Sequence, residues 1–254
     1  MPGMSDRVRV EIDGAVRTVT LTRPEKGNAM DAEMLRDLED AFDPAPGPGP
    51  AERVAVIRAE GRVFCSGLDL RGSLGKDQDV EKLFHRVETW PLPVVAVVQG
   101  AAIAGGNELA LHCDLVVAST DARFGMSLAQ VGLAPSWFLT KKLLEVGGPV
   151  VTREILLLGD PVPAQRMAEL GLIARCVPAA DLQGAATAVI DRLVRNAPLS
   201  LRAMKATINR QMAYRDSIEH ADTDELVRTA MRSTDAKEGV RARMERRDAD
   251  FTGT

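Results

Sequence analysis

The segment that most constrains the fold is residues 99–114, which read Gln-Gly-Ala-Ala-Ile-Ala-Gly-Gly-Asn-Glu-Leu-Ala-Leu-His-Cys-Asp. The apolar run Val94–Val98 before it predicts a buried strand, and the pattern over Glu108–Cys113 predicts a helix. Glycine at a strand-to-helix turn lets the backbone approach a ligand closely, and the first N–H groups of a helix have no intrahelical partner. We therefore expect the Gly105 and Gly106 amides to form a site for an anion or a developing oxyanion, with the Glu108 carboxyl beside them.

A purely structural interpretation of this segment stays open. Acidic side chains are favoured in the first helical turn, so Glu108 could serve only as a capping residue in a tight strand–helix connection. The double glycine alone does not separate a chemical site from such a connection. The rest of the chain has to decide between the two.

Length and charge exclude several classes of protein. The 254 residues are 45% hydrophobic and 27% charged, which is ordinary for one large globular domain, or for one domain with a smaller appendage. The net charge of -4 predicts no nucleic-acid partner. The basic run Arg241–Arg247 is interrupted by Glu245 and is interpreted as a solvated helix face.

Cysteine and histidine positions give no sign of disulfides or of a metal site. The cysteines lie far apart without a Cys-x-x-Cys motif and favour a reducing compartment; they are Cys65, Cys113 and Cys176. No apolar stretch approaches the ~20 residues of a membrane span, and Met1–Arg9 lacks the apolar region of a signal peptide, so we expect a cytoplasmic protein without membrane contact. His85 and His112 have no partners at metal-ligand spacing, and His112 is interpreted as a core histidine or one that supports the site from behind.

Apolar spacing predicts strands and helices in alternation, followed by helices alone. Asp13-Gly14 is a favoured hairpin turn, Pro135 and Pro163 resemble first-turn helix prolines, and the pattern is helical almost throughout Leu182–Arg247. This order indicates an α/β core with a helical C-terminal extension. Strands are predicted at Val8–Ile12, Ala15–Leu21, Val54–Ile57, Val94–Val98, Leu115–Ala118 and Leu172–Val177, helices at Asp31–Phe42, before Trp90 and over Ala164–Leu170, and polar or Pro/Gly-rich connections at Pro44–Pro50 and Gly72–Asp79.

Several short motifs occur in a fixed order along nearly the whole chain. They are Arg23-Pro24 with Asn28-Ala29-Met30, Phe64–Leu70, Pro93–Gly100, Ala104–Leu109, Cys113-Asp114, Phe124-Gly125, Gly132–Pro135, Leu158–Asp160, and a tail from Lys237 to Arg246 with Phe251. Each motif is weak by itself. The ordered set resembles the crotonase superfamily of enoyl-CoA hydratases and isomerases.

The resemblance implies a fold and a ligand. The α/β fold would be a crotonase-like spiral of ββα turns over residues 1–196 that binds acyl-CoA, followed by a helical region over residues 197–254 that packs homotrimers or dimers of trimers. The substrate would be an acyl-CoA thioester, with no separate cofactor because coenzyme A is part of the substrate. The family's two oxyanion donors fall on the N–H groups of Leu68 and Gly105, which with Glu108 are the candidate catalytic groups.

Substrate-binding candidates surround these donors. Arg23 and Lys26 are candidates to meet the CoA phosphates, and Arg246 to reach a neighbouring subunit's ligand, although each could be a plain surface charge. Met126, Trp137 and Phe138 could line an acyl pocket or pack in the core. The full candidate set is Arg23, Lys26, Cys65, Ser66, Gly67, Asp69, Gly106, Leu128, Trp137 and Arg246.

One feature of the family is missing. Its hydratases carry a second catalytic glutamate shortly after a Phe-Gly pair, and here the segment Phe124–Leu128 puts Leu128 at that position. Apolar bulk at Trp137 and Phe138 follows where the family has a glycine-rich turn. Such a pocket would hold a catalytic water poorly, because an ordered water needs about two to four polar partners.

The sequence therefore predicts an acyl-CoA-processing enzyme, most simply an enoyl-CoA hydratase-like lyase that retains Glu108 and has lost the second carboxylate. Two alternatives stay open. One is a non-catalytic or nearly inactive acyl-CoA-binding protein, and the other is a crotonase with different enolate chemistry, such as isomerisation or decarboxylation. A single carboxyl suits proton transfer at an enolate if burial raises its pKa toward neutrality.

Overall fold

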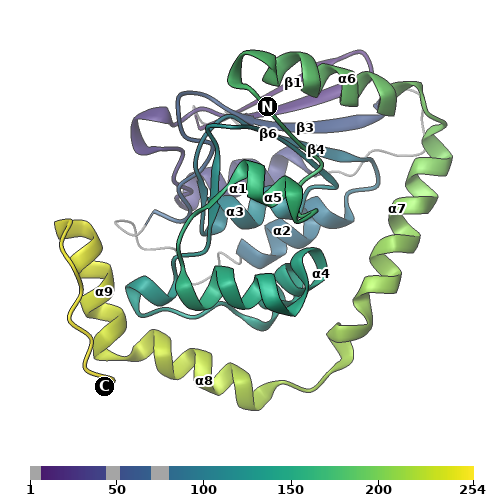
Figure 1. Cartoon of the computed structure of the whole chain (residues 1–254). Coiled ribbons are helices and arrows are strands. Elements are labelled where there is room, and N and C mark those ends of the chain that lie inside the picture. Colours follow the sequence, from purple (N-terminus) through teal and green to yellow (C-terminus); the bar gives the residue numbers. More distant parts are fainter. Residues whose placement is uncertain (1–6, 44–51, 70–79) are drawn as a thin grey trace.

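A six-stranded sheet in the order β1-β2-β3-β4-β6-β9 organises the part of the chain that the computed structural model describes, residues 7–43, 52–69 and 80–254 (Figure 1). The β1–β2 hairpin is antiparallel and turns at the predicted Asp13-Gly14, and every later pairing in this sheet is parallel. The strands are β1 Val8–Asp13, β2 Val16–Leu21, β3 Val54–Ala59, β4 Val94–Val98, β6 Leu115–Ser119 and β9 Arg175–Val177, and a smaller sheet contains β5 Ala102–Ile103, β7 Arg123–Gly125 and β8 Val162–Pro163.

Both faces of the central strands are buried, which explains their continuous apolar sequences. Side chains alternate between the two faces of a strand. Val95 and Val97 pack toward α6, whereas Val94, Ala96 and Val98 belong to the larger core on the other face. The helices are α1 Ala32–Ala41, α2 Val80–Thr89, α3 Gly105–Leu111, α4 Trp137–Arg153, α5 Ala164–Glu169, α6 Leu182–Arg195, α7 Pro198–Met212, α8 Ala221–Arg232 and α9 Thr234–Glu245.

The alternation of strands and helices is confirmed, with local corrections. The predicted strand at Leu172–Val177 is shortened to Arg175–Val177, because Leu172 and Ile173 pack into the core instead. Pro135 precedes α4, where the Ser136 hydroxyl caps the helix by accepting from the Leu139 amide at 3.3 Å. Pro163 is the N-cap of α5 and not a residue of its first turn. The predictions for Pro44–Pro50 and Gly72–Asp79 lie outside the described residues.

The helices α7 and α8 form an arm along the periphery, and α9 returns to the body of the molecule (Figure 1). An ion pair fastens the start of this arm. The Lys205 ammonium lies 2.6 Å from Asp114 Oδ2 and donates to the Leu92 carbonyl at 3.1 Å, while Asp114 also accepts from the Val94 amide. The arm is thus held at the beginning of β4, beside the strand that leads into the glycine turn.

The return of α9 depends on a close backbone approach. A Cβ at Gly239 would lie 2.4 Å from the carbonyl carbon and oxygen of Val131, in the short helical turn η2, Ala129–Val131. Those atoms are backbone and cannot rotate away. Because η2 follows directly on Leu128, this contact sets α9 beside that residue.

We predict that Gly239→Ala weakens the docking of α9 by about 1–3 kcal/mol, since the added methyl overpacks against backbone. The matched control is Gly184→Ala in α6, where a Cβ meets nothing within 4 Å. That change should stabilise the protein by about 0.5–1 kcal/mol, the usual effect of replacing glycine in a helix. Denaturant midpoints and amide hydrogen exchange in α9 measure both effects, and unchanged exchange in Gly239→Ala would contradict the packing argument.

Candidate active site

Two chain segments meet at the candidate site: the loop of residues 64–69 after β3 and the turn of residues 101–106 after β4. The Cys65 amide donates to the Ala101 carbonyl at 3.1 Å, and the Ile103 amide donates to the Cys65 carbonyl at 2.9 Å. On its other side the loop pairs with Met30, whose amide donates to the Gly67 carbonyl at 2.8 Å. The loop is therefore held between two neighbours by backbone hydrogen bonds.

These bonds leave two amides unused. In the Met30 pairing, residues 67 and 69 supply the hydrogen-bonding groups, so the N–H of Leu68 between them has no acceptor within the described ranges. The N–H of Gly105 also has none, because it is the first residue of α3. The two amides lie close together, since Leu68 N is 3.7 Å from the position of a Cβ on Gly105. They form a pair of neighbouring donors; their role as oxyanion donors, which the family resemblance implies, stays a prediction.

Backbone conformations without room for side chains produce this arrangement. Gly67 has a φ of +98°, and a Cβ there would lie 3.0 Å from the Ile103 carbonyl oxygen. A Cβ on Gly106 would lie 2.1 Å from the Cys65 carbonyl oxygen. Ala104 is held at a φ of 50° and ψ of -119°, a strained conformation for a residue with a side chain. The α3 helix has only seven residues, so the donors act through direct hydrogen bonding more than through a helix dipole.

The two donors stand in the wall of an apolar cavity of about 190 Å³. Among the lining side chains, those of Ser66, Ser127 and Arg243 are polar or charged, and the others are apolar. Leu128 is part of this wall, so an apolar side chain borders the cavity where the family resemblance implies an acid. The lining residues are Ser66, Leu68, Val80, Phe84, Ile103, Ala104, Gly105, Met126, Ser127, Leu128, Val131, Leu133, Leu139 and Arg243.

A polar basin of about 370 Å³ adjoins the cavity, and Ser66, Leu68 and Arg243 line both. Lys26 and Arg246 also line the basin, opposite the acidic Glu25 and Asp69. Lys26 and Arg246 thus come together at one surface, as candidates for an anionic ligand. Arg246 borders the basin of its own chain, and its reach toward a neighbouring subunit's ligand stays a prediction.

Arg23 has a different role from the predicted phosphate contact. Its guanidinium lies 2.9 Å from Asp69 Oδ2 and 3.3 Å from Asp31 Oδ2, and it donates to the Ala29 carbonyl. Its side chain is only 13% exposed. The charge of Arg23 is therefore matched by two carboxylates, and the residue joins the loop after β2 to the loop that carries Leu68. Asp69 takes part in this pairing and also lines the basin, so its predicted substrate contact stays a prediction.

Three other candidates do not line the cavity. Cys65 is fully buried, and burial raises the pKa of its thiol to about 12, so it is a packing residue. Gly106 permits the close approach to Cys65 described above. Trp137 lies away from the cavity, and its ring stacks on that of His220 with the ring centroids 4.6 Å apart. Trp137 is the first residue of α4, and Leu139 of the same helix lines the cavity instead. Phe138 stacks on His112, which places it behind the cavity wall.

Glu108 is completely buried in α3 and does not line the cavity. Neither carboxyl oxygen has a hydrogen-bond partner among the described residues. Burial raises the pKa of Glu108 to about 8, opposed by the positive charge of Lys142. The carboxyl is thus protonated at neutral pH and lies one helical turn from the Gly105 amide.

His112 is the nearest titratable neighbour of Glu108. Its Nδ1 lies 3.7 Å from Glu108 Oε2 and 2.8 Å from the Glu108 carbonyl oxygen. Burial lowers the pKa of His112 to about 3, so the imidazole is neutral. Its ring lies between those of Phe84 and Phe138, with centroid distances of 5.3 and 5.1 Å. The two aromatic rings separate the imidazole from solvent.

Sequence reasoning missed several residues of the site. Phe84 and Leu139 were covered only by helical patterns, which do not say what an apolar face contacts. Arg243 lies in the basic run interpreted as a solvated helix face, yet it lines both the cavity and the basin. The available sequence signal was Gly239, because a glycine inside a predicted helix often marks a close backbone contact.

In the described part of the chain no cluster of His, Cys, Asp or Glu could hold a metal, and no helix is long and apolar enough to cross a membrane.

Comparison with known proteins gives consistent results. A family model described as enoyl-CoA hydratase/isomerase matches residues 11–254. The (E)-benzylidenesuccinyl-CoA hydratase of Thauera aromatica is 31% identical over 97% of this chain and 99% of its own length. An enoyl-CoA hydratase structure from Mycobacterium avium subsp. paratuberculosis is 28% identical, with a TM-score of 0.84 over 97% of this chain and 98% of that chain. A methylmalonyl-CoA decarboxylase structure, 22% identical over 98% of this chain and 99% of that chain, shares the fold with a TM-score of 0.88.

The raised pKa of Glu108 predicts a pH dependence of stability. The folded protein binds this proton more tightly than the unfolded chain, whose carboxyl titrates near 4.5. Stabilisation by the Glu108 proton is complete below pH 4.5 and is lost as the pH rises toward about 8. Relative to Glu108→Gln, which cannot titrate, the wild type should lose roughly 3–5 kcal/mol of unfolding free energy across that range. Urea unfolding of both proteins at several pH values measures the difference, and parallel curves would show an ordinary pKa.

Proposed function

The chain belongs to the enoyl-CoA hydratase/isomerase family, and on that premise we propose that it is an enzyme acting on acyl-CoA thioesters through an enolate. The observation that supports this best is the pair of unused amides, Leu68 N–H and Gly105 N–H, in the wall of an apolar cavity. A thioester carbonyl between them would accept both hydrogen bonds. Donors fixed in this way stabilise negative charge on the oxygen without reorganisation, and one such donor is typically worth about 10²–10³ in rate.

The adjoining basin suits the coenzyme A moiety. Lys26, Arg243 and Arg246 line it, and cationic side chains are the usual partners of phosphate groups. Since Ser66 and Leu68 belong to both spaces, a thioester at the junction would send its acyl group into the cavity and its CoA portion into the basin. We infer that these two spaces together form one substrate site.

Glu108 is the acid or base in this proposal. The protonated carboxyl can deliver its proton to the α-carbon of an enolate, and the carboxylate that remains can take one back in the reverse direction. Because Glu108 does not line the cavity, its side chain has to turn toward the substrate during the reaction. A pKa near the operating pH is suited to such a group.

Hydration of an enoyl-CoA is the simplest reaction of this kind, but its water would be poorly held. Leu128 borders the cavity, and Gln130 is bonded away from it, to the Leu158 carbonyl and to Asp160. Few polar groups are then available to orient a water at the β-carbon. This favours slow hydration, with isomerisation or decarboxylation through the same enolate as the alternative chemistry. A nearly inactive acyl-CoA-binding protein is the non-enzymatic alternative.

We also propose that the protein assembles as a homotrimer or a dimer of trimers through its helical arm. Large apolar side chains are exposed on α7 and α8, among them Leu199, Ile208 and Leu226, which are 68%, 61% and 70% exposed. Exposed apolar side chains along two successive helices are typical of a surface that another subunit covers.

Glu108→Gln should lower turnover of the best acyl-CoA substrate by about 10²–10⁴-fold, because glutamine keeps the shape of the side chain but cannot transfer a proton. The affinity for crotonyl-CoA, measured by calorimetry, should change little, since the basin and the two amides are untouched. Full turnover by Glu108→Gln would remove the assigned role. A wild-type protein that shows no heat with crotonyl-CoA or with longer acyl-CoAs would contradict the substrate class.

Leu128→Glu should raise crotonyl-CoA hydration above a weak wild-type rate, because the new carboxylate supplies a polar partner for the attacking water. Leu139→Ala should add to the gain by opening the cavity, whereas Trp137→Ala should not, since that ring lies elsewhere. Leu133→Glu, which introduces the same charge at another point of the cavity wall, is the matched control. Robust hydration by the unaltered protein, measured by loss of enoyl-thioester absorbance, would show that Leu128 does not lower the hydration rate and would contradict the prediction.

A further inference from the structure

Among the residues that the structure describes, Arg243 is the charged one that lines the apolar cavity of the candidate site. Within the same part of the chain its guanidinium forms no ion pair and no hydrogen bond. The Ser127 hydroxyl, which belongs to a residue only 8% exposed, also lines the cavity and makes no hydrogen bond to a described residue. The cavity therefore contains a cation and a hydroxyl that are both available to a ligand.

The course of α9 along η2 brings Arg243 to the cavity. A Cβ at Gly132 would lie 2.6 Å from the carbonyl oxygen of Asp235, at the start of α9. A Cβ at Gly239, one turn later in the helix, would lie 2.4 Å from the carbonyl oxygen of Val131. Residues four apart share one face of a helix, so Arg243 follows Gly239 on the face that packs on η2. Arg243 is thus placed by close backbone packing and not by a flexible loop.

The sequence of α9 provides no acid for this arginine. Within a helix, an acid stabilises an arginine from a position three or four residues away. Those positions around Arg243 are occupied by Gly239, Val240, Arg246 and Arg247. Two carboxylates, Asp69 and Glu25, line the basin but not the cavity, and Asp69 lies 2.9 Å from Arg23. The positive charge of Arg243 at the cavity is therefore not matched by an acid of the cavity wall.

We propose that the substrate of this site is an acyl-CoA whose acyl group carries a carboxylate, and that Arg243 binds this carboxylate. A guanidinium donates two parallel hydrogen bonds to a carboxylate, and the Ser127 hydroxyl is available as a further donor. The inference rests on the proposed function, in which the acyl group of a thioester occupies the cavity. It adds the chemical class of that acyl group.

The position of Arg243 distinguishes it from the other cations of the site. Lys26 and Arg246 line the basin alone, where the CoA phosphates are expected, whereas Arg243 lines the basin and the cavity. If Arg243 served only the CoA portion, its removal would weaken every acyl-CoA by the same factor. If it binds an acyl carboxylate, its removal weakens only those acyl-CoAs that carry one. The two roles therefore predict different outcomes for matched ligands.

The test compares pairs of saturated thioesters in which both acyl chains have the same number of carbons. Glutaryl-CoA ends in a carboxylate where pentanoyl-CoA ends in a methyl group, and succinyl-CoA and butyryl-CoA form a shorter pair. None has a double bond to hydrate, so calorimetry measures binding alone. We expect the wild type to bind the carboxylate member of at least one pair more tightly, by about fivefold or more. Arg243→Met, which keeps an unbranched stem without the charge, should remove this preference, and Arg243→Glu should reverse it.

Two further arginines of the same region serve as matched controls. Arg241→Met makes the same substitution in α9 at a residue that pairs with Glu238 and lines neither space, so the preference should stay at its wild-type value. Arg246→Met removes a charge from the basin alone and should weaken both members of a pair equally. A selective loss of the carboxylate member in Arg246→Met would place that carboxylate in the basin and overturn the assignment to Arg243.

The proposal is also overturned if the wild type binds both members of each pair equally, or if Arg243→Met weakens them by the same factor. Such results would leave the proposed function standing, because the uncharged thioesters would still bind. A wild-type protein that binds none of the four thioesters would contradict the proposed function and this inference together. Binding without preference and absence of binding therefore separate the two failures.

Discussion

The approach of the loop at residues 64–69 to the turn at residues 101–106 is the constraint on which the rest of the site depends. The contact is made by backbone atoms. It is possible because residue 106 is a glycine: a Cβ at that position would lie only 2.1 Å from the Cys65 carbonyl oxygen. Hydrogen bonds on both sides of the loop fix the Leu68 amide near Gly105. Hydrogen bonds to neighbouring segments hold Ala104 in its strained conformation. The Ala104 amide donates to the Gly125 carbonyl at 2.8 Å, and the preceding Ile103 amide donates to the Cys65 carbonyl at 2.9 Å.

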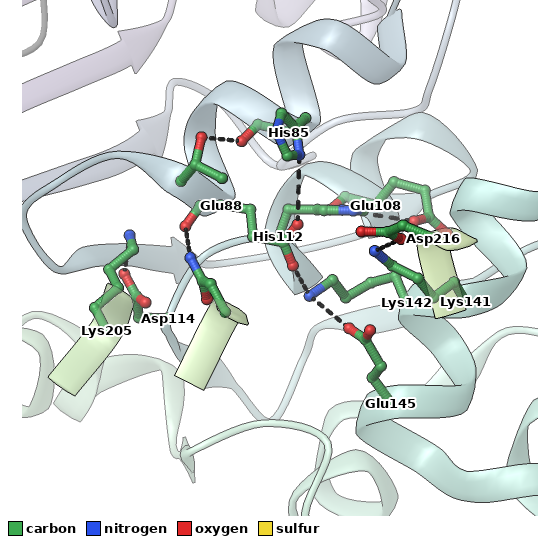
Figure 2. A network of polar contacts seen from close by, with 12 residues as sticks. His85, Glu88, Glu108, His112, Asp114, Lys141, Lys142, Glu145, Lys205 and Asp216 are labelled. Atoms are coloured by element: carbon green, nitrogen blue, oxygen red, sulfur yellow. Dashed lines mark hydrogen bonds and ion pairs between the residues drawn. The ribbon is translucent and has the colours of Figure 1, made fainter. Parts of the chain in front are cut away.

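Burial then decides what the acid of this site can do. An isolated carboxylate is costly in an apolar interior, so Glu108 holds its proton at neutral pH. The same surroundings keep His112 neutral. Ionised groups lie in the layer behind, where Lys142 contacts Glu88 and Glu145 (Figure 2). The site thus has an apolar front and a charged layer behind it.

The peripheral arm contributes to the site because α9 returns to it (Figure 1). Close packing of Gly239 on the η2 backbone brings Arg243 to the border between the cavity and the basin. The ion pair of Lys205 with Asp114 fastens the other end of the arm near β4. A helical extension that could have served assembly alone therefore also lines the candidate site.

The sequence by itself determined the strand–helix alternation and the glycine turn at Gly105 and Gly106, because these depend on local spacing and on the absence of a Cβ. It also indicated the family, through the order of many weak motifs. Only the tertiary structure decided which charges are free and which face lines the cavity. Arg23 forms ion pairs with Asp69 and Asp31, whereas Arg243 lines the cavity. Helical or strand periodicity in the sequence predicts neither of these positions. Such pairings and the burial of Glu108 depend on segments far apart in the chain, which come together only when the core has packed.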